Sequence, residues 1–177
     1  MIGFFKNKAR HNAIDKARKK LKRNMSFRNL ETIKSVGIII RYQFEIGDTA
    51  INKLIDFFKK KNTSLEILVY YPDKKLPANV NFSEDTLLFT EGDTNWFGKP
   101  NKKEIENFIN TDFGLLIDLL PQYVYSLQYI VESSKASFKI GRISYDNAPY
   151  DFILLGDENN DRKYVDELFN YLGKIER

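Results

Sequence analysis

Short, almost purely apolar runs alternate with amphipathic stretches along most of this chain, and that alternation decides its fold class. Runs with the length and composition of strands occupy residues 36–44, 65–71, 86–90, 113–120, 137–143 and 150–155. Stretches with apolar residues every three or four positions, typical of helices, occupy residues 51–61, 101–109, 121–131 and 161–173. Strands that alternate with helices predict a mainly parallel sheet that helices cover on both faces. We therefore expect an α/β fold: a Rossmann-like three-layer sandwich with five to six strands, preceded by a basic N-terminal helix.

Two of the expected helices carry a signal for their first residue. Asn101, with Glu104 three positions later, has the spacing of a capping box. Pro121 is a residue type that favours the first turn of a helix. These signals predict helix starts near 101 and 121.

The length of 177 residues fits one domain of this kind. We expect a basic helix and linker over residues 1–30 and a single Rossmann-like α/β domain over 31–177. No apolar run approaches the roughly 18 residues of a spanning helix. The first charges follow the apolar residues instead of preceding them, so a secretory signal is not expected. The expected compartment is the cytoplasm.

The residue inventory excludes several chemistries. The chain has no cysteine and a single histidine, His11, which disfavours thiol catalysis, Cys/His zinc sites and a Ser-His-Asp relay. The glycine-rich patterns that bind dinucleotides or nucleoside triphosphates are absent. We therefore predict neither a cofactor nor a metal site, and we leave enzymatic activity open while favouring a non-enzymatic role.

Positive charge is concentrated at the N-terminus. Residues 1–24 contain nine Lys or Arg and one acid, a net charge of +8, whereas the whole chain carries +4 and the remainder therefore −4. Ala13, Ala17 and Leu21 recur every fourth residue, which predicts a helix with a thin apolar stripe. The residues expected to bind an anionic surface are Lys16, Arg18, Lys19, Lys20, Lys22 and Arg23.

Several partners are compatible with this basic segment. It could lie on an anionic membrane surface, grip RNA phosphates, bind an acidic protein, or pack on the acidic remainder of its own chain. The alanine stripe is small for membrane insertion, and no aromatic residue interleaves the cations for base stacking. Further along, Trp96 is either an exposed aromatic for recognition or a lid over the edge of a core.

A second candidate site lies at the carboxyl edge of the expected sheet, where ligands bind in open parallel sheets. The residues expected there for an unknown small-molecule ligand are Arg41, Asp48, Asp118 and Arg142. Both carboxylates have a structural alternative. Asp48 has the position of a helix N-cap, and Asp118 is placed to accept backbone hydrogen bonds in the turn before Pro121.

Two stretches resemble a known enzyme family. Residues 37–54, GIIIRYQFEIGDTAINKL, and 113–142, FGLLIDLLPQYVYSLQYIVESSKASFKIGR, resemble parts of the N-terminal half of heptosyltransferase-type glycosyltransferases of the GT-B fold. The resemblance implies a Rossmann-like half with Asp48 at the position of that family's candidate base. Those enzymes use a second half to hold the nucleotide-sugar donor, so the resemblance implies the fold more than the activity.

A second resemblance extends over nearly the whole chain. The pattern NWFGKP…FI…FGLLIDL…SKASFKIGR…YDFIL…YL looks like an uncharacterised family of small Bacteroidetes proteins, a domain of unknown function. It implies a cytoplasmic α/β protein without a known activity. We expect a binding or interaction module whose basic helix engages an anionic partner. The alternative is a small ligand-binding or glycosyltransferase-related domain that uses the sheet edge around Asp48 and Asp118.

Overall fold

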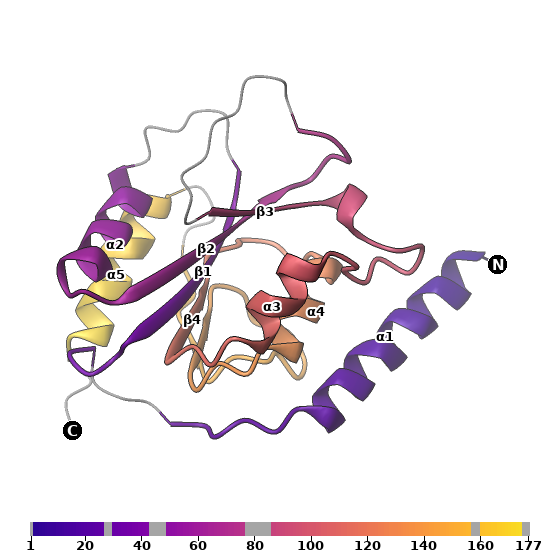
Figure 1. Ribbon diagram of the computed structural model, residues 1–177, viewed down its shortest axis with the longest axis horizontal. Helices are drawn as coiled ribbons and strands as arrows, with labels where there is room; N and C mark the ends of the chain where they lie inside the picture. Colours follow the sequence, from indigo (N-terminus) through magenta and orange to yellow (C-terminus); the bar gives the residue numbers. More distant parts are fainter. Residues whose placement is uncertain (1, 27–29, 43–48, 77–85, 157–159, 175–177) are drawn as a thin grey trace.

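The structure is a computed structural model, and it describes residues 2–26, 30–42, 49–76, 86–156 and 160–174 (Figure 1). The strands within these ranges are β1 (Ser35–Arg41), β2 (Ser64–Tyr71), β3 (Thr86–Thr90), β4 (Leu115–Asp118), β5 (Lys139–Gly141) and β6 (Phe152–Ile153). The helices are α1 (Ile2–Lys20), α2 (Thr49–Lys60), the 3-10 turn η1 (Glu91–Asp93), α3 (Lys103–Asn110), α4 (Tyr125–Ser133) and α5 (Asp161–Leu172). The order of strands and α-helices is the predicted one.

The described strands form one parallel sheet in the order β3-β2-β1-β4-β5-β6. The strand order reverses between β1 and β4, because the chain first adds strands on one side of β1 and then returns to the other. Ile38 of β1 lies opposite Ile67 of β2 and Ile117 of β4. The carboxyl ends of these strands therefore lie along one edge of the sheet, as predicted.

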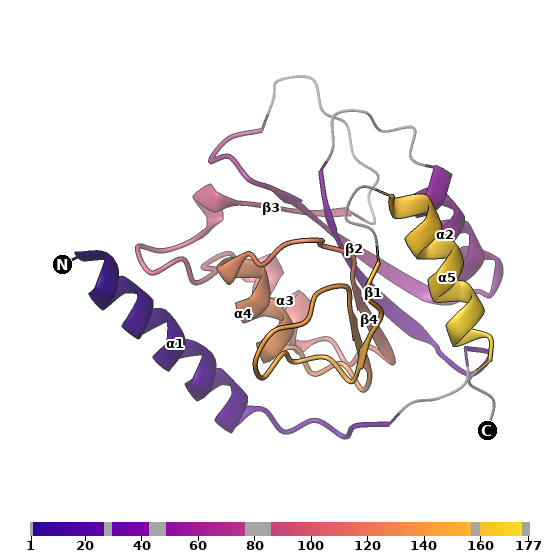
Figure 2. The ribbon, with the colours of Figure 1, turned by 180° about the vertical axis from the view of Figure 1, so that it is seen from behind.

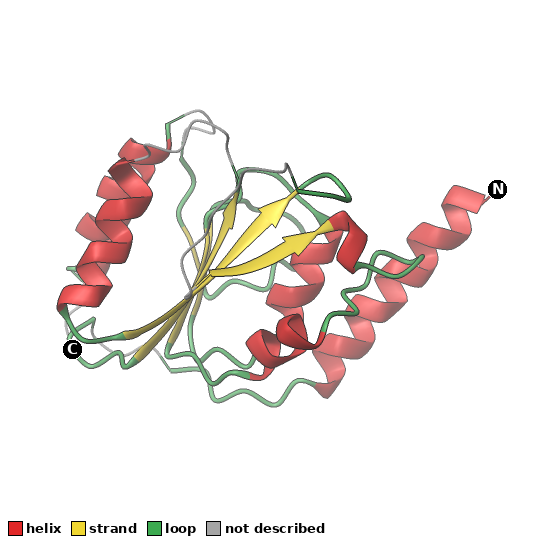
Figure 3. Cartoon of the chain, turned by 45° about the horizontal axis from the view of Figure 1, so that its top comes forward, coloured by secondary structure: helices red, strands yellow, loops and turns green. Residues whose placement is uncertain are grey.

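Helices cover both faces of the sheet, which confirms the Rossmann-like arrangement. The pair α2 and α5 lies on one face, and α3 and α4 lie on the other (Figures 2 and 3). Successive residues of the central strand serve opposite cores, as the two-residue period of a strand requires. Ile38 packs in the core that contains Phe58 of α2, whereas Ile39 packs in the core that contains Phe108 of α3.

Helix α1 forms an additional outer layer that packs against α4 (Figure 1). The inward side of α1 carries the alanine stripe, and its residues Ala13 and Ala17 are half-buried. Seven of the nine residues of α4 are buried. The sheet covers one side of this helix, and α1 packs against another. Among the described residues, no helix combines the length and apolar character required to cross a membrane.

Both helix-start signals were wrong by a few residues. Helix α3 begins at Lys103, with Lys102 as an N-cap that makes no side-chain hydrogen bond. The backbone N–H of Asn101 instead donates to Asp93 O at 3.0 Å, which ties Asn101 into the preceding loop. Helix α4 begins at Tyr125, after a turn that contains Pro121. In both places the tertiary loop takes precedence over the local capping preference.

Two arginines fasten α1 and the segment after it to the rest of the chain. Arg18 forms an ion pair with Glu132 of α4, whose side chain is 4% exposed, and Arg18 Nη2 donates to Asn147 O at 2.8 Å. Arg23 forms an ion pair with Asp151, whose side chain is 7% exposed. Each arginine therefore neutralises a carboxylate that is almost completely removed from water.

We expect Arg18→Ala to destabilise the protein, because it leaves the buried Glu132 carboxylate without its cation. The expected loss in the free energy of unfolding is about 2 kcal/mol. Lys16→Ala, an exposed position on the same helix, is the matched control and should stay within roughly 0.5 kcal/mol of the parent. Urea denaturation of both variants measures the difference, and equal effects would contradict the proposed role of the ion pair.

Candidate functional site

Three of the four predicted ligand residues lie at the carboxyl ends of adjacent strands. Arg41 is the last residue of β1 and is exposed, Asp118 is the last residue of β4, and Arg142 directly follows β5. Asp118 and Arg142 are 1% and 4% exposed. Asp48 lies outside the described residues. The fold thus brings three of the four predicted residues to neighbouring strand ends, beside the point where the strand order reverses.

The Asp118 carboxylate has a hydrogen-bond partner on each oxygen. The backbone N–H of Leu120 donates to Oδ1 at 3.0 Å, and the Tyr150 hydroxyl donates to Oδ2 at 2.7 Å. The first bond is the backbone role considered above for the turn before Pro121. Burial raises the pKa of Asp118 to about 6, although both hydrogen bonds act to lower it. Asp118 thereby links the end of β4 to the connection between β5 and β6.

A chain of hydrogen bonds leads away from Asp118. Gln128 of α4 donates from Nε2 to the Tyr150 hydroxyl at 3.0 Å, and the Tyr145 hydroxyl donates to Gln128 Oε1. Burial raises the pKa of both tyrosines, so their hydroxyls remain protonated donors near neutral pH. This network of Tyr145, Gln128, Tyr150 and Asp118 was missed from the sequence, because its members come from three separate segments.

Tyr150 approaches Gly141 closely. A Cβ atom on Gly141 would lie 2.3 Å from the nearest atom of the Tyr150 ring, so glycine is required for the ring to pack against the end of β5. The ring in turn places the hydroxyl on Asp118. Close packing at this end of β5 therefore fixes the hydrogen-bond network.

Arg142 also makes contacts inside the protein. Its Nη1 donates to Leu119 O at 3.4 Å, and its guanidinium carbon lies 4.6 Å from the centroid of the Tyr164 ring of α5. Burial raises the pKa of Tyr164, and the charge of Arg142 acts in the opposite direction. The buried cation connects the end of β4 to α5.

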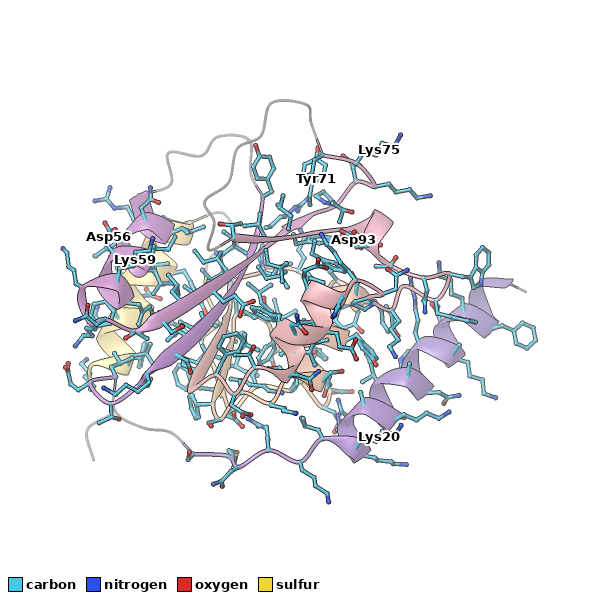
Figure 4. All side chains as sticks on the ribbon, viewed as in Figure 1. Lys20, Asp56, Lys59, Tyr71, Lys75 and Asp93 are labelled. Atoms are coloured by element: carbon cyan, nitrogen blue, oxygen red, sulfur yellow. The ribbon has the colours of Figure 1, made fainter. Side chains whose placement is uncertain are left out.

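The predicted anion-binding residues separate into two groups. Arg18 and Arg23 pair with Glu132 and Asp151, as described above. The hydrogen bond from Arg18 to Glu132 raises the pKa of the guanidinium. The other predicted cations are exposed, and no described residue forms an ion pair with them; they are Lys16, Lys19, Lys20 and Lys22. Lys20 lies at the C-terminal end of α1, on the outer side of the molecule (Figure 4).

A buried amine lies close to the ion pair that Arg23 forms with Asp151. Lys139 of β5 is 1% exposed, and its Nζ donates to Val131 O at 2.6 Å. Burial lowers the pKa of Lys139 to about 7, with a further lowering by the nearby charge of Arg23. The backbone N–H of Lys139 donates to Asp151 Oδ2 at 2.8 Å, so Asp151 is held from two sides. Among the described residues, no group of three or more His, Cys, Asp or Glu could hold a metal ion.

Replacing Asp118 should change how stability depends on pH. Its folded-state pKa of about 6 lies above the unfolded value, so the stability that the protonated form contributes is fully present below 3.8 and is lost as the pH rises through about 6. The free energy of unfolding of Asp118→Asn, relative to that of the parent, should therefore rise by about 2 kcal/mol between about pH 4 and about pH 7. Urea denaturation at both pH values provides the measurement. The exposed Asp146→Asn is the control, and the same relative change in that variant would contradict the assignment to Asp118.

Comparison with known proteins identifies the family without giving a function. A search of curated proteins finds no match. The sequence pattern of one protein family, a family of unknown function (DUF6913), matches residues 6–175. This match includes most of α1 as well as the sheet and the helices that cover it. The chain therefore belongs to the family of unknown function DUF6913.

Proposed function

We propose that the protein is a non-enzymatic binding module of the cytoplasm, and that the outer face of α1 binds an anionic partner. The outer face consists of Lys8, Lys16, Lys19 and Lys20, all of which are exposed. The observation that carries the proposal is that the cations of residues 1–24 have two different environments. Arg18 and Arg23 pair with buried acids, whereas the lysines of the outer face are exposed to water.

Docking of α1 gives these lysines a fixed arrangement. Arg10 Nε donates to Phe97 O at 2.9 Å in the middle of the helix, and Arg18 pairs with Glu132 near its end. These two contacts hold the C-terminal half of the helix against the domain. Cations on a fixed surface lose less conformational freedom on binding than cations on a disordered tail, which favours association with a phosphate-bearing surface.

A second candidate function is supported by Asp118 and Arg142. Two buried charged groups lie at adjacent strand ends next to the reversal of strand order, where small molecules bind in related folds. The site would serve a small ligand, as in a glycosyltransferase-related half. A ligand bound there should raise the Tm, and Arg41→Ala should remove that rise. The absence of any rise with sugar phosphates and nucleotide sugars would count against this candidate.

The first proposal predicts that Lys16→Gln, Lys19→Gln and Lys20→Gln together weaken binding to anionic partners. Each cation near an anionic surface contributes about 1 kcal/mol, so loss of three should lower the affinity by roughly a hundredfold. Binding should also weaken as salt increases, since the contacts are electrostatic. Co-sedimentation with anionic vesicles and filter binding of RNA measure the two main partner classes.

The matched control removes the same charge elsewhere. Lys60, Lys75 and Lys103 are exposed and lie on α2, on the segment after β2 and on α3. Their combined replacement by Gln should leave the affinity nearly unchanged. Equal losses in the two triple variants would show that only net charge matters and would overturn the role of the outer face. Deleting α1 is a weaker test, because it also removes Arg18, the partner of Glu132.

A further inference from the structure

Three large aromatic side chains are exposed near the N-terminal end of α1. Phe5 of α1 is 63% exposed, and Trp96 and Phe97 of the loop 94–100 are 68% and 46% exposed. We call these three residues the aromatic tip. The loop lies against the helix, because the Lys6 ammonium is 5.5 Å from the centroid of the Trp96 ring. The exposure of Trp96 excludes the alternative that it is a lid over a core.

The loop that carries Trp96 and Phe97 is held in shape by its own hydrogen bonds. Asn95 Oδ1 accepts hydrogen bonds from the backbone N–H groups of Phe97 and Lys99, at 3.0 and 3.1 Å. The N–H of Gly98 donates to Asn95 O at 2.8 Å, and Gly98 has a φ of 81°, which favours glycine. The two aromatic side chains are therefore displayed in water by a turn that is already ordered, which lowers the entropy cost of binding.

Cations surround the aromatic tip. Lys6 lies over Trp96, and the guanidinium of Arg10 lies 4.6 Å from the centroid of Tyr125 while its Nε binds Phe97 O. Lys99 follows in the same loop, with its ammonium 5.2 Å from the Tyr129 ring centroid. The tip thus combines apolar rings with positive charge at one end of the molecule.

Phe5 and three lysines of the outer face point to the same side of α1. Phe5, Lys8, Lys16 and Lys19 are separated by three, eight and three residues, which places them on one stripe of a helix with 3.6 residues per turn. Phe5 therefore connects the two sets of residues, since it belongs to the aromatic tip and also lies on the lysine stripe.

We propose that the anionic partner is a lipid bilayer, an inference that rests on the function proposed above. The aromatic tip enters the interface between headgroups and acyl chains, and the lysines of the outer face contact lipid phosphates. Aromatic rings bordered by cations suit this boundary, because the rings leave water while the ammonium groups stay among the headgroups. Single-stranded RNA fits less well, since Lys6 lies over one face of Trp96 and leaves only the other face for stacking on a base.

Trp96 provides the test, because it is the only tryptophan in the chain. Full-length protein is titrated with vesicles of phosphatidylcholine alone and with vesicles that also contain phosphatidylserine. We expect the Trp96 emission to shift to shorter wavelength, and its quenching by acrylamide to fall, only with the anionic vesicles. Unchanged emission during co-sedimentation would overturn insertion of the tip while leaving electrostatic binding by the lysines intact.

Substitutions then separate the two contributions. Trp96→Ala should lower the affinity for anionic vesicles about tenfold in co-sedimentation, because a large apolar side chain no longer leaves water. Tyr171→Ala, which removes a 50% exposed aromatic of α5, is the matched control and should change nothing. Equal affinities for Trp96→Ala and the parent would overturn the inference.

An RNA oligonucleotide forms the last arm of the test. Binding to RNA without binding to vesicles would overturn the lipid assignment and support the function proposed above with a different partner. The absence of binding to both would overturn the lipid assignment and remove the support for an anionic partner as well.

Discussion

Burial of the central strands on both faces is the constraint on which the rest of the structure depends. Val36 and Ile38 of β1 project into the core beneath α2 and α5, and Ile39 projects into the core beneath α3 and α4. All three side chains are completely buried. A sheet with two apolar faces is stable only when helices cover both, so the apolar character of β1 requires the three layers.

Buried carboxylates impose a second constraint. Glu132 and Asp151 are nearly inaccessible to water, and an unpaired buried carboxylate is costly. Arg18 and Arg23 supply the compensating charges from α1 and the segment after it. The same requirement turns the remaining lysines of α1 outward, so the docking of the helix and the charge of its exposed face have one cause.

The sequence is sufficient for the architecture and much less so for the sites. The order of elements follows from apolar runs and helical spacing, which are local signals. Asp118 was correctly placed at a strand end, but its partner Tyr150 was expected to begin the last strand and lies instead in the connection before β6. The ion pair of Arg18 with Glu132 joins segments that are far apart in the chain, so no local sequence pattern predicts it.

The aromatic tip illustrates the same limit. In the sequence, the small alanine stripe disfavours membrane insertion, and the lack of aromatic residues between the cations disfavours base stacking. Folding places Trp96, from a distant loop, beside Lys6, so an aromatic side chain lies next to a cation of the basic helix. Tertiary contacts of this kind depend on how α1 docks, which helical periodicity does not specify.

The position of β3 at the end of the sheet has a consequence for self-association. A terminal strand offers unpaired backbone groups to any extended chain, and proteins often protect such edges with lysine. Lys102 provides that protection here, since its Nζ donates to Leu88 O of β3 at 3.1 Å. An incoming strand would have to displace this ammonium and strip its water. Lys102 thus opposes edge-to-edge aggregation through β3.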